Sequence, residues 1–321
     1  MRILLVKTSS LGDVIHNLPV AGDLARRFSG ATIDWVVEEA FADLPRLHPA
    51  VDRVLPVAVR RWRRRLFAPS TWQEIGAFRR ALQERTYDVI VDSQGLLKSG
   101  LVAGQARVAP DGRRCGHSRE SAREGTAARF YNVGYTIPRS LHAVERNRQL
   151  AAAALGYALD MPFDYGIAAP PQAVDWLKKK DYAVLLTATS RADKLWPDPD
   201  WQALGTALIA MGLTCVLPAG SAEERQRSTR LATALGRAVA APPMSLAGMA
   251  GLLAGAQFVV GVDTGLVHLA AALDRPTLAL FCGSDPKLTG VYAGVQAVSL
   301  GGAGAPPSAG EAIAAAMGLV G

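Results

Sequence analysis

Cysteine is scarce in this sequence, and long uninterrupted apolar runs are missing. The 321 residues include three cysteines, Cys115, Cys215 and Cys282. They are far apart and show no Cys-x-x-Cys spacing, which excludes a disulfide framework or a cysteine zinc site and favours a reducing compartment. The apolar stretch near the N-terminus is too short for a signal peptide. The most apolar region, 246–262, is interrupted by glycines and falls short of the roughly 20 apolar residues that span a bilayer. We therefore expect a protein that is soluble or rests on a membrane surface.

Positive charge is in excess, with a formal net charge of +7. Five arginines lie within the six residues 60–65, and a second arginine group occupies 107–123. Such a run can be a solvated face, a nucleic-acid patch or a binding site for an anionic substrate. A nucleic-acid patch needs interleaved aromatic residues or a recognised module, and Trp62 alone offers little support. Arginine binds carboxylates and phosphates bidentately, so the run favours an acceptor that carries such groups.

Apolar strands and amphipathic helices alternate along both halves of the sequence. In the first half we expect strands at 3–6, 33–37 and 89–92 and helices at 14–28 and 72–84. In the second half we expect strands at 182–186, 214–217, 258–262 and 277–281 and helices at 201–211, 222–235, 246–254, 266–273 and 310–317. This alternation predicts parallel sheets covered on both faces.

A cluster of proline and glycine at 156–171 interrupts the alternation and suits an interdomain linker. The fold class predicted is α/β, with two Rossmann-like domains at 1–165 and 166–321 whose parallel sheets face a central cleft, the GT-B arrangement. The helix at 310–317 is a candidate to pack back on the first domain. Ligands of such sheets lie beyond the carboxyl ends of the strands, so functional residues are expected on the loops that follow strands.

The loop after the first strand, 7–14, reads Lys-Thr-Ser-Ser-Leu-Gly-Asp-Val. Its small residues leave backbone amides free for an oxygen-rich ligand, although the spacing is not that of a Walker A loop. Position alone favours a helix-capping role for Asp13. The alternative is a general base that deprotonates an acceptor hydroxyl as it attacks an anomeric carbon. A second strand-end turn, 92–95, lies in the same half with Lys98 nearby.

The loop after the first strand of the second half carries hydroxyl groups and an amine. The hydroxyls of Thr189 and Ser190 and the ammonium of Lys194 are suited to holding a diphosphate, whereas the alternative is an ordinary polar loop. Residues 198–200, Asp-Pro-Asp, formally match the DxD motif of metal-dependent glycosyltransferases. They lie directly ahead of a helical pattern, so we interpret them as a helix start and assign no metal.

A third constellation lies where the strand 258–262 gives way to a helix. Thr264 and Gly265 begin that helix, and its exposed amides favour phosphate. His268 lies about one turn into the helix, on the side of its start. A lone histidine is more often structural, but its combination with a strand end and a small turn favours a site. Asp263 either caps the helix or binds a donor hydroxyl.

Several short segments, in this order along the chain, resemble the heptosyltransferase family, glycosyltransferase family 9. The resemblance implies transfer of L-glycero-D-manno-heptose from ADP-heptose to the first Kdo of Kdo2–lipid A, in lipopolysaccharide inner-core synthesis. It further implies inversion at the anomeric carbon, no metal, no cofactor, no nucleic-acid partner, and peripheral contact with the cytoplasmic face of the inner membrane. The matching segments are 6–13, 34–39, 60–63, 94–99, 142–146, 193–197 and 262–266.

The family's functional residues fall on identified positions of this sequence. Asp13 matches the catalytic base of the family. This match favours the general base over the helix-capping role that position alone favoured. Glu224 is expected to bind ribose hydroxyls and Met244 to pack near adenine, roles that spacing did not indicate. The donor contacts implied are Thr189, Ser190, Lys194, Glu224, Met244, Asp263, Thr264, Gly265 and His268. The acceptor contacts implied are Ser10, Arg60, Arg61, Arg63, Lys98, Arg123 and His142. Two departures are a serine at 190, where family members often carry threonine, and a poor match over 103–125.

Two other interpretations remain open at this point. One is the related family member that adds the second heptose, and the other is a non-catalytic module that binds nucleotides or nucleic acid. The arginine run at 60–65 and the segment 7–10 favour the enzyme that adds the first heptose. Release of ADP from ADP-heptose in the presence of Kdo2–lipid A would distinguish the three.

Overall fold

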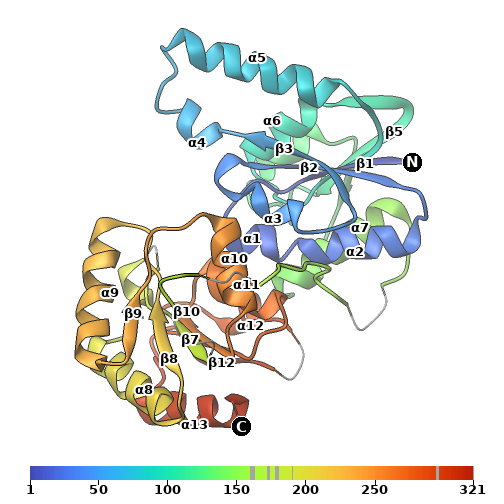
Figure 1. Cartoon of the computed structure of the whole chain (residues 1–321). Helices are drawn as coiled ribbons and strands as arrows, with labels where there is room; N and C mark the ends of the chain where they lie inside the picture. Colours follow the sequence, from blue (N-terminus) through green and yellow to red (C-terminus); the bar gives the residue numbers. More distant parts are fainter. Residues whose placement is uncertain (160–162, 172–173, 178–180, 190, 294–295, 321) are drawn as a thin grey trace. The chain divides into compact units, whose positions relative to one another are not determined.

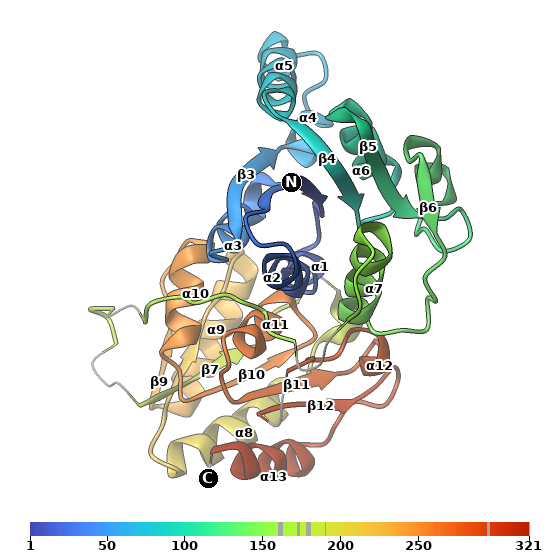
Figure 2. The ribbon, with the colours of Figure 1, turned by 90° about the vertical axis from the view of Figure 1, so that its right-hand side faces the viewer.

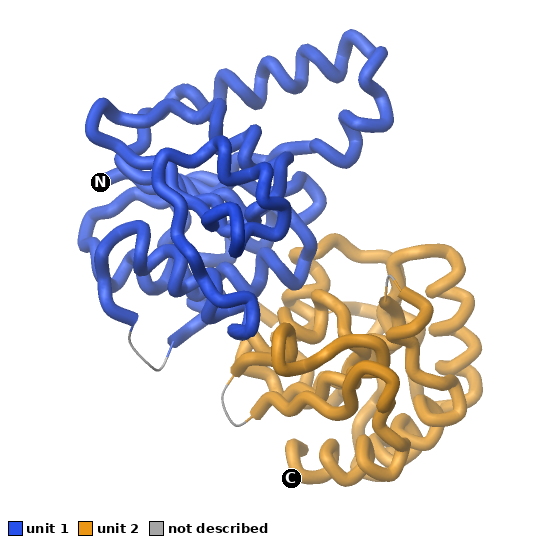
Figure 3. The backbone as a smooth tube through the Cα atoms, turned by 180° about the vertical axis from the view of Figure 1, so that it is seen from behind, with its two compact units in different colours: residues 1–167 blue, residues 168–321 orange. Residues whose placement is uncertain are grey.

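The chain forms two compact units, 1–167 and 168–321 (Figure 3). The structure is a computed structural model that describes residues 1–159, 163–171, 174–177, 181–189, 191–293 and 296–320. The division falls two residues from the expected boundary, in the proline- and glycine-rich segment 156–171. The described residues of that segment form no helix or strand. The loss of alternating pattern there therefore coincides with the joint between the two units.

Unit 1 is built on a six-stranded parallel sheet in the order β3-β2-β1-β4-β5-β6 (Figure 1). Its strands are β1 (Arg2–Val6), β2 (Thr32–Glu38), β3 (Val51–Val57), β4 (Thr86–Asp92), β5 (Arg107–His117) and β6 (Val133–Tyr135). This is the strand order of the Rossmann fold, in which the winding reverses between the first and fourth strands. Val6 at the end of β1 pairs with Asp92 at the end of β4. The loops that follow these two strands therefore begin side by side.

Helices cover both faces of the sheet of unit 1 (Figure 2). On one face, Trp62, Leu82 and Val102 pack against strand residues such as Leu4 and Val36 in one apolar cluster. On the other face, α2 contacts α7, which also lies against β4 and β5. The helices are α1 (Leu11–Ile15), α2 (Leu18–Arg27), α3 (Asp43–Arg46), α4 (Val59–Trp62), α5 (Pro69–Gln83), α6 (Leu97–Gln105) and α7 (Ala143–Leu155), with 3-10 turns η1 (Glu39–Phe41) and η2 (Gly125–Phe130).

Unit 1 differs from the sequence-based expectation in two respects. The helix expected at 14–28 is divided into α1 and α2, and α2 carries Pro19 in its first turn, where proline is tolerated. Several elements were not predicted, among them β5. The sequence of β5 is rich in arginine and glycine, and all of its first eight residues are exposed or partly exposed. It therefore lacks the apolar run of a strand that is buried on both faces.

Unit 2 repeats the same strand order with its own six parallel strands, β12-β11-β10-β7-β8-β9. The strands are β7 (Tyr182–Leu186), β8 (Thr214–Leu217), β9 (Ala238–Ala240), β10 (Phe258–Val262), β11 (Thr277–Phe281) and β12 (Ala297–Gly301). The winding reverses between β7 and β10, where Leu186 pairs with Gly261. The four strands predicted in this half are all present, and each is buried along its whole length.

The helices of unit 2 also lie on both faces of its sheet. Trp201, Leu204 and Leu231 pack in one cluster with alternate strand residues such as Leu185 and Val260. The helices are α8 (Asp198–Ala210), α9 (Ala222–Leu235), α10 (Leu246–Ala254), α11 (Gly265–Ala272), α12 (Pro286–Thr289) and α13 (Ala309–Val320), with the 3-10 turn η3 (Ala192–Lys194).

The final helix, α13, was a candidate to pack back on the first domain. Its buried residues, Ala312 and Ala316, instead belong to the apolar cluster of unit 2, and the helix contacts α8 and β11. The physical reason is that the small side chains of this helix fit closely over an apolar face of its own sheet. None of the helices in the described part of the chain combines the length and apolarity needed to cross a bilayer.

Candidate active site

Asp13 lies in the first turn of α1, directly after the loop that follows β1. Ser10 is the N-cap of this helix, and its backbone N–H and its hydroxyl both donate to Oδ2 of Asp13, at 2.7 and 3.1 Å. The side chain of Asp13 is nevertheless 30% exposed. Asp13 therefore does help to close the first turn, as its position suggested, but as the third helical residue rather than as the N-cap. Its carboxylate stays accessible to a ligand.

The loop ahead of Asp13 is held by side chains that follow β4. Gln94 accepts the backbone N–H groups of Thr8 and Ser9 through its Oε1, both at 3.1 Å. Nζ of Lys98 donates to the Ser9 hydroxyl at 2.7 Å. These contacts link residues more than 80 positions apart along the chain. They fix the backbone from which Asp13 projects.

A buried lysine lies beneath this loop. Nζ of Lys7 donates to the carbonyl oxygen of Ser93 at 2.8 Å and to Oδ1 of Asn147 at 3.1 Å. Burial lowers the pKa of Lys7 to about 8, although the charges of Asp13 and Asp92 oppose that shift. Lys7 thus joins the loops after β1 and β4 to α7 and supplies positive charge behind the carboxylate of Asp13.

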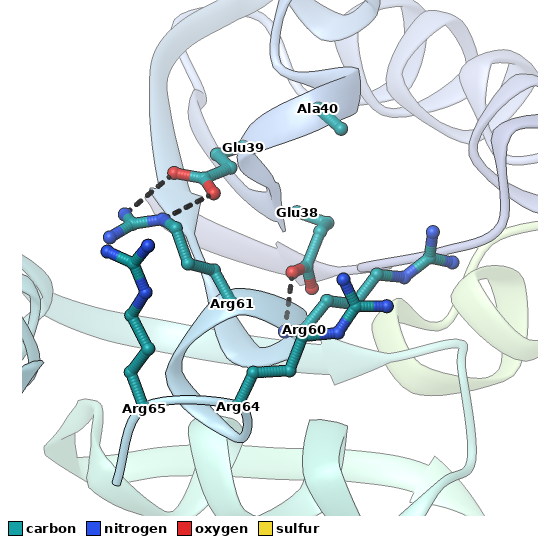
Figure 4. A pocket seen from close by; sticks show the side chains of 7 residues that line it. All are labelled: Glu38, Glu39, Ala40, Arg60, Arg61, Arg64 and Arg65. Carbon is teal, nitrogen blue, oxygen red and sulfur yellow. Dashed lines mark hydrogen bonds and ion pairs between the residues drawn. The ribbon is translucent and has the colours of Figure 1, made fainter. Parts of the chain in front are cut away.

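A pocket of about 410 Å³ lies where β2 ends and α4 begins (Figure 4). Arg61 donates to both oxygens of Glu39, at 2.9 and 3.0 Å, and to Glu74 at 2.9 Å, and these bonds raise the pKa of Arg61. The backbone N–H of Arg60 donates to Oε1 of buried Glu38 at 2.8 Å. The pocket is therefore basic but not uniformly so. Its lining residues are Glu38, Glu39, Ala40, Arg60, Arg61, Arg64 and Arg65.

The arginines predicted to contact an acceptor divide into two groups. Arg60 and Arg61 line the pocket, and Figure 4 shows them beside two arginines that were not assigned a role, Arg64 and Arg65. Arg63 is exposed but is not one of the residues that line this pocket. Four of the five arginines in 60–65 therefore line the pocket, and Arg63 does not. The sequence alone did not indicate which of the five would face it.

Two further acceptor candidates lie in different settings. Arg123 is exposed, and its Nη1 lies 4.0 Å from Oδ2 of Asp13. His142 is buried and is the N-cap of α7, where its Nδ1 accepts the backbone N–H of Val144 at 3.2 Å. Arg123 therefore lies near the carboxylate of Asp13. His142 already has a structural role at a helix start.

In unit 2, polar side chains surround Asp263, which follows β10. Nζ of Lys194 and the hydroxyl of Ser284 both donate to its Oδ2 at 2.5 Å. The hydroxyl of Thr189, from the loop after β7, donates to the backbone carbonyl of Asp263 at 3.0 Å. Nε2 of His268 lies 3.6 Å from Oδ1 of Asp263. The structure thus brings together four of the predicted donor residues, on the segments that follow β7 and β10. They are Thr189, Lys194, Asp263 and His268.

This network controls the charge of Asp263. Burial acts to raise the pKa of its carboxyl group, but hydrogen bonds from His268, Lys194 and Ser284 outweigh burial and hold that pKa well below its usual range. Asp263 is therefore an anion at neutral pH that orients the Lys194 ammonium. The close approach of the loop that carries Lys194 depends on Gly283, where a Cβ atom would lie 2.7 Å from the carbonyl oxygen of Asp193.

A pocket of about 390 Å³ opens beside this network, lined entirely by residues of unit 2. Four predicted donor residues, Thr189, Glu224, Met244 and Thr264, contribute to its wall. The wall is formed by the loops after β7, β8, β9 and β10, so it lies at the carboxyl edge of the sheet. The complete lining is Leu186, Ala188, Thr189, Pro218, Ala219, Gly220, Glu224, Met244, Ser245, Leu246, Met249, Thr264 and Leu266.

Glu224 also has a local structural role at the start of α9. Its Oε2 accepts the backbone N–H groups of Gly220 and Ser221, at 2.8 and 3.1 Å. Gly265 is the first residue of α11, and Thr264 is its N-cap, so their amides lie at the positive end of that helix. Of the donor residues named from the sequence, Ser190 lies outside the described residues.

The Asp-Pro-Asp segment is a helix start, as predicted. Asp198 is the first residue of α8, and its Oδ1 accepts Nε of Arg227 at 2.7 Å. Among the residues that the structure describes, no group of three or more His, Cys, Asp or Glu side chains is arranged to hold a metal ion.

Some residues of the site were not predicted from the sequence. Gln94 belongs to a strand-end turn that had been noted but given no role. Ser284 lies three residues after β11, so the rule that ligands bind beyond strand ends would have singled it out. Arg64 and Arg65 were part of a recognised arginine run, but no local pattern indicated which members face a pocket.

The family model described as Glycosyltransferase family 9 (heptosyltransferase) matches residues 75–311. Lipopolysaccharide heptosyltransferase 1 of Pseudomonas aeruginosa is 49% identical over 302 residues, which cover 94% of this chain and 84% of that protein. By contrast, lipopolysaccharide heptosyltransferase 2 of Salmonella typhimurium is 36% identical over 102 residues, 30% of this chain and 29% of that protein.

Solved structures agree with these sequence matches. The structure of E. coli heptosyltransferase WaaC with ADP superposes with a TM-score of 0.88 at 41% identity and covers 97% of this chain and 98% of that one. The same enzyme with ADP-2-deoxy-2-fluoro heptose gives a TM-score of 0.83 at 43% identity, covering 95% and 94%. The expected pair of Rossmann-like domains is thereby confirmed, and the chain belongs to glycosyltransferase family 9, the heptosyltransferases.

Proposed function

We propose that this chain transfers L-glycero-D-manno-heptose from ADP-heptose to the first Kdo of Kdo2–lipid A. The observation that carries the proposal is its similarity, over nearly the whole length, to a heptosyltransferase whose structures contain ADP and an ADP-heptose analogue. Unit 2 has a pocket with hydroxyls, a lysine and a helix start at its edge, which suits a nucleotide sugar. Unit 1 has an accessible carboxylate near arginines, which suits an anionic sugar acceptor.

The donor would occupy the pocket of unit 2. Met244 would pack near the adenine, and Glu224 would accept hydrogen bonds from the ribose hydroxyls. The diphosphate would lie at the start of α11, against the amides of Thr264 and Gly265 and the ammonium of Lys194. Oriented amides and a fixed cation stabilise the charge that develops on the leaving ADP, which is where such groups accelerate the reaction most. Thr189, Ser190, Asp263 and His268 complete the proposed donor set.

Asp13 would act as the general base. Its carboxylate would take the proton of the attacking Kdo hydroxyl, whose oxygen forms the new bond to the anomeric carbon of heptose. The bond from that carbon to the β-phosphate oxygen breaks, and ADP leaves with the electron pair on the opposite face, so the configuration inverts. The reaction requires both substrates to be bound at once and water to be kept from the donor.

The acceptor would be held in unit 1 by basic groups near Asp13. Arg123 lies nearest to the carboxylate, and Arg60 lines the adjacent basic pocket with an exposed side chain. Arg61 donates hydrogen bonds to Glu39 and Glu74. It would therefore fix the shape of the pocket wall as well as contact the acceptor. Ser10, Arg63, Lys98 and His142 are the remaining proposed contacts, and His142 has the weakest structural support because it caps α7.

Neither a metal ion nor a nucleic acid is part of the proposal. Lys194 and the amide groups at the start of α11 supply positive charge to the diphosphate, the part that a metal plays in other glycosyltransferases. Since the acceptor is a membrane lipid and the donor a nucleotide sugar, we place the enzyme at the cytoplasmic face of the inner membrane, in peripheral contact with it.

Turnover of the two proposed substrates tests the function directly. The protein is incubated with ADP-heptose and Kdo2–lipid A, with and without a chelator, and ADP release and the mass of the lipid product are measured. We expect a lipid product that carries one added heptose, and a rate of ADP release that the chelator leaves unchanged. An enzyme that adds the second heptose would need an already heptosylated acceptor. A non-catalytic binding module would release no ADP.

A further inference from the structure

The segment that joins α4 to α5 exposes large apolar side chains. Phe67 is fully exposed, at 102% of its reference area, and Leu66 and Trp72 are 47% and 62% exposed. These three residues lie within seven positions of one another. Leaving such side chains in water costs free energy, and a concentration of them on one surface is typical of a contact with a partner or a membrane.

The contacts of this segment hold its shape without burying its apolar groups. Nε1 of Trp72 donates to the carbonyl oxygen of Leu66 at 2.8 Å. Behind it, Nε1 of Trp62 donates to Glu74 at 2.8 Å, and the Trp62 ring packs against Phe78 in the core. The segment is thus anchored through the buried Trp62 side. Leu66 and the exposed ring of Trp72 are presented outward from a structured loop.

Exposed arginines flank this segment in the sequence. Arg63, Arg64 and Arg65 immediately precede Leu66 and are all exposed. Arg79 and Arg80 on α5 are exposed as well. Figure 1 shows α4, α5 and the loop between them in unit 1, where α5 contacts β3 and α6. We call residues 63–67 together with Trp72 the basic apolar tip.

We propose that the basic apolar tip is the surface by which this chain docks on an anionic lipid bilayer. Arginines attract anionic headgroups, and aromatic rings settle at the boundary between headgroups and acyl chains. The combination matters, because charge alone binds weakly at physiological salt and a few apolar side chains alone give only marginal binding. An aliphatic Leu66 beside Phe67 favours a bilayer over a nucleic acid, which would need stacking rings rather than aliphatic groups.

The inference rests on the proposed function in one respect. An acceptor embedded in a bilayer must be reached by an enzyme that has no membrane-spanning helix among its described residues. The basic pocket lined by Arg60 and Arg61 lies on α4, next to the tip in sequence. Docking through the tip would bring the acceptor-binding residues of unit 1 to the surface from which the sugar headgroup projects.

Vesicle binding by the full-length protein tests the inference. Flotation is measured with vesicles of phosphatidylcholine alone and with vesicles that also contain phosphatidylglycerol, at low and high salt. We expect binding to the anionic vesicles, weakened by salt because the arginine contribution is screened. Replacing Phe67→Ser should weaken this binding roughly tenfold or more, since it removes a ring that would leave water on docking. Because Phe67 is fully exposed, the substitution should leave the fold intact.

A matched control variant shows whether vesicle binding depends on the basic apolar tip or on exposed apolar surface in general. Met317, on α13, is 58% exposed, and Met317→Ser should leave vesicle binding unchanged. Trp72 is exposed and the other five tryptophans are buried or partly buried, so lipids brominated on their acyl chains should quench the protein's fluorescence mainly through Trp72. Replacing Trp72→Phe should remove that quenching.

Each outcome decides for or against docking. The inference would be overturned if the wild type did not bind anionic vesicles, or if Phe67→Ser bound them as well as the wild type. It would also be overturned if Phe67→Ser and Met317→Ser lost vesicle binding equally, or if the protein bound single-stranded DNA through Phe67 but did not bind vesicles. Heptose transfer to a deacylated, water-soluble acceptor keeps the two proposals apart. If that transfer fails in the wild type, the proposed function fails, whereas Phe67→Ser should transfer to the soluble acceptor at the wild-type rate.

Discussion

The backbone N–H of Ser10 donates to Oδ2 of Asp13 at 2.7 Å, across the first turn of α1. The same carboxylate therefore both closes a helix and faces solvent. Replacing it with an amide separates these two properties. An asparagine at position 13 can still accept the Ser10 N–H through its side-chain oxygen, but it cannot take a proton from an acceptor hydroxyl.

Asp13→Asn should consequently lower turnover by about two orders of magnitude or more, the usual contribution of a general base. Affinity for ADP, which would bind in unit 2, should stay at the wild-type value, and so should the unfolding midpoint. The measurements are steady-state rates and ADP titration by calorimetry. A variant that turns over as fast as the wild type would show that Asp13 is not the base.

Gln94→Met should lower turnover without changing ADP affinity. Gln94 is the acceptor for the backbone N–H groups of Thr8 and Ser9, and without it two amides of the loop before Asp13 lose their partner. Each unpaired buried group costs about 1–3 kcal/mol, so the loop should open more often, which amide hydrogen exchange at Thr8 and Ser9 would report. Gln83→Met, which removes a side-chain bond to the carbonyl oxygen of Gln105, is the matched control and should leave exchange at this loop unchanged.

Glu224→Gln and Glu224→Ala should differ in a defined way. The glutamine can still accept the N–H groups of Gly220 and Ser221, so α9 should keep its start. It loses the negative charge that would hold the ribose hydroxyls, and the ADP dissociation constant should rise roughly tenfold. The alanine variant should show the same loss of affinity and a lower stability as well. If both variants bound ADP with wild-type affinity, Glu224 would not be a donor contact.

Asp263→Asn should make the protein less stable in a manner that depends on pH. The pKa of Asp263 is lowered from 3.8 in the folded chain, so its ionised form contributes stability above that value. As the pH falls below 3.8, the unfolded chain takes up a proton that the folded chain does not, and the contribution diminishes. The difference in unfolding free energy between wild type and variant should therefore be largest near neutral pH and narrow in acid. Urea titrations across pH measure it, and a difference that widens in acid would contradict the assignment.

Asp23→Asn should destabilise unit 1 strongly. Asp23 and Arg148 form a buried ion pair between α2 and α7, with Nε of Arg148 2.7 Å from Oδ2 of Asp23. Removing the charge of Asp23 leaves the buried guanidinium of Arg148 without the carboxylate that neutralises it, at a cost on the order of 3 kcal/mol. The exposed pair of Asp43 and Arg46 is the matched control, and Asp43→Asn should change the unfolding free energy by less than about 0.5 kcal/mol. Similar losses in both variants would mean that burial is not the cause.

The strands that carry the site were readable from the sequence because parallel strands are buried on both faces. β1, β4, β7 and β10 appear as short apolar runs, and their polar successors mark the sheet edge where ligands bind. The helix start at Asp198 was readable for a similar local reason. The polar, half-exposed β5 has no apolar run and was not predicted. The break between α1 and α2 was not predicted either, because the amphipathic pattern continues across it.

The roles of Glu224 and Met244 came from family resemblance alone, because neither position stands out by spacing. The structure places both in the wall of the unit 2 pocket, a placement that makes the roles testable. The resemblance also supplied the identity of the sugar and of the acceptor, which no arrangement of side chains in one chain can specify by itself.

The amino-acid sequence determined where strands, helices and their polar ends occur, since these depend on the local period of apolar residues. Only the tertiary structure decided which ends meet: Gln94 with the amides of the loop 8–9, Ser284 with Asp263, and Arg61 with Glu39. Each of these contacts joins residues 21 to 86 positions apart. The physical reason is that the order of strands in a parallel sheet is fixed by packing among distant segments, and that order sets which loops become neighbours.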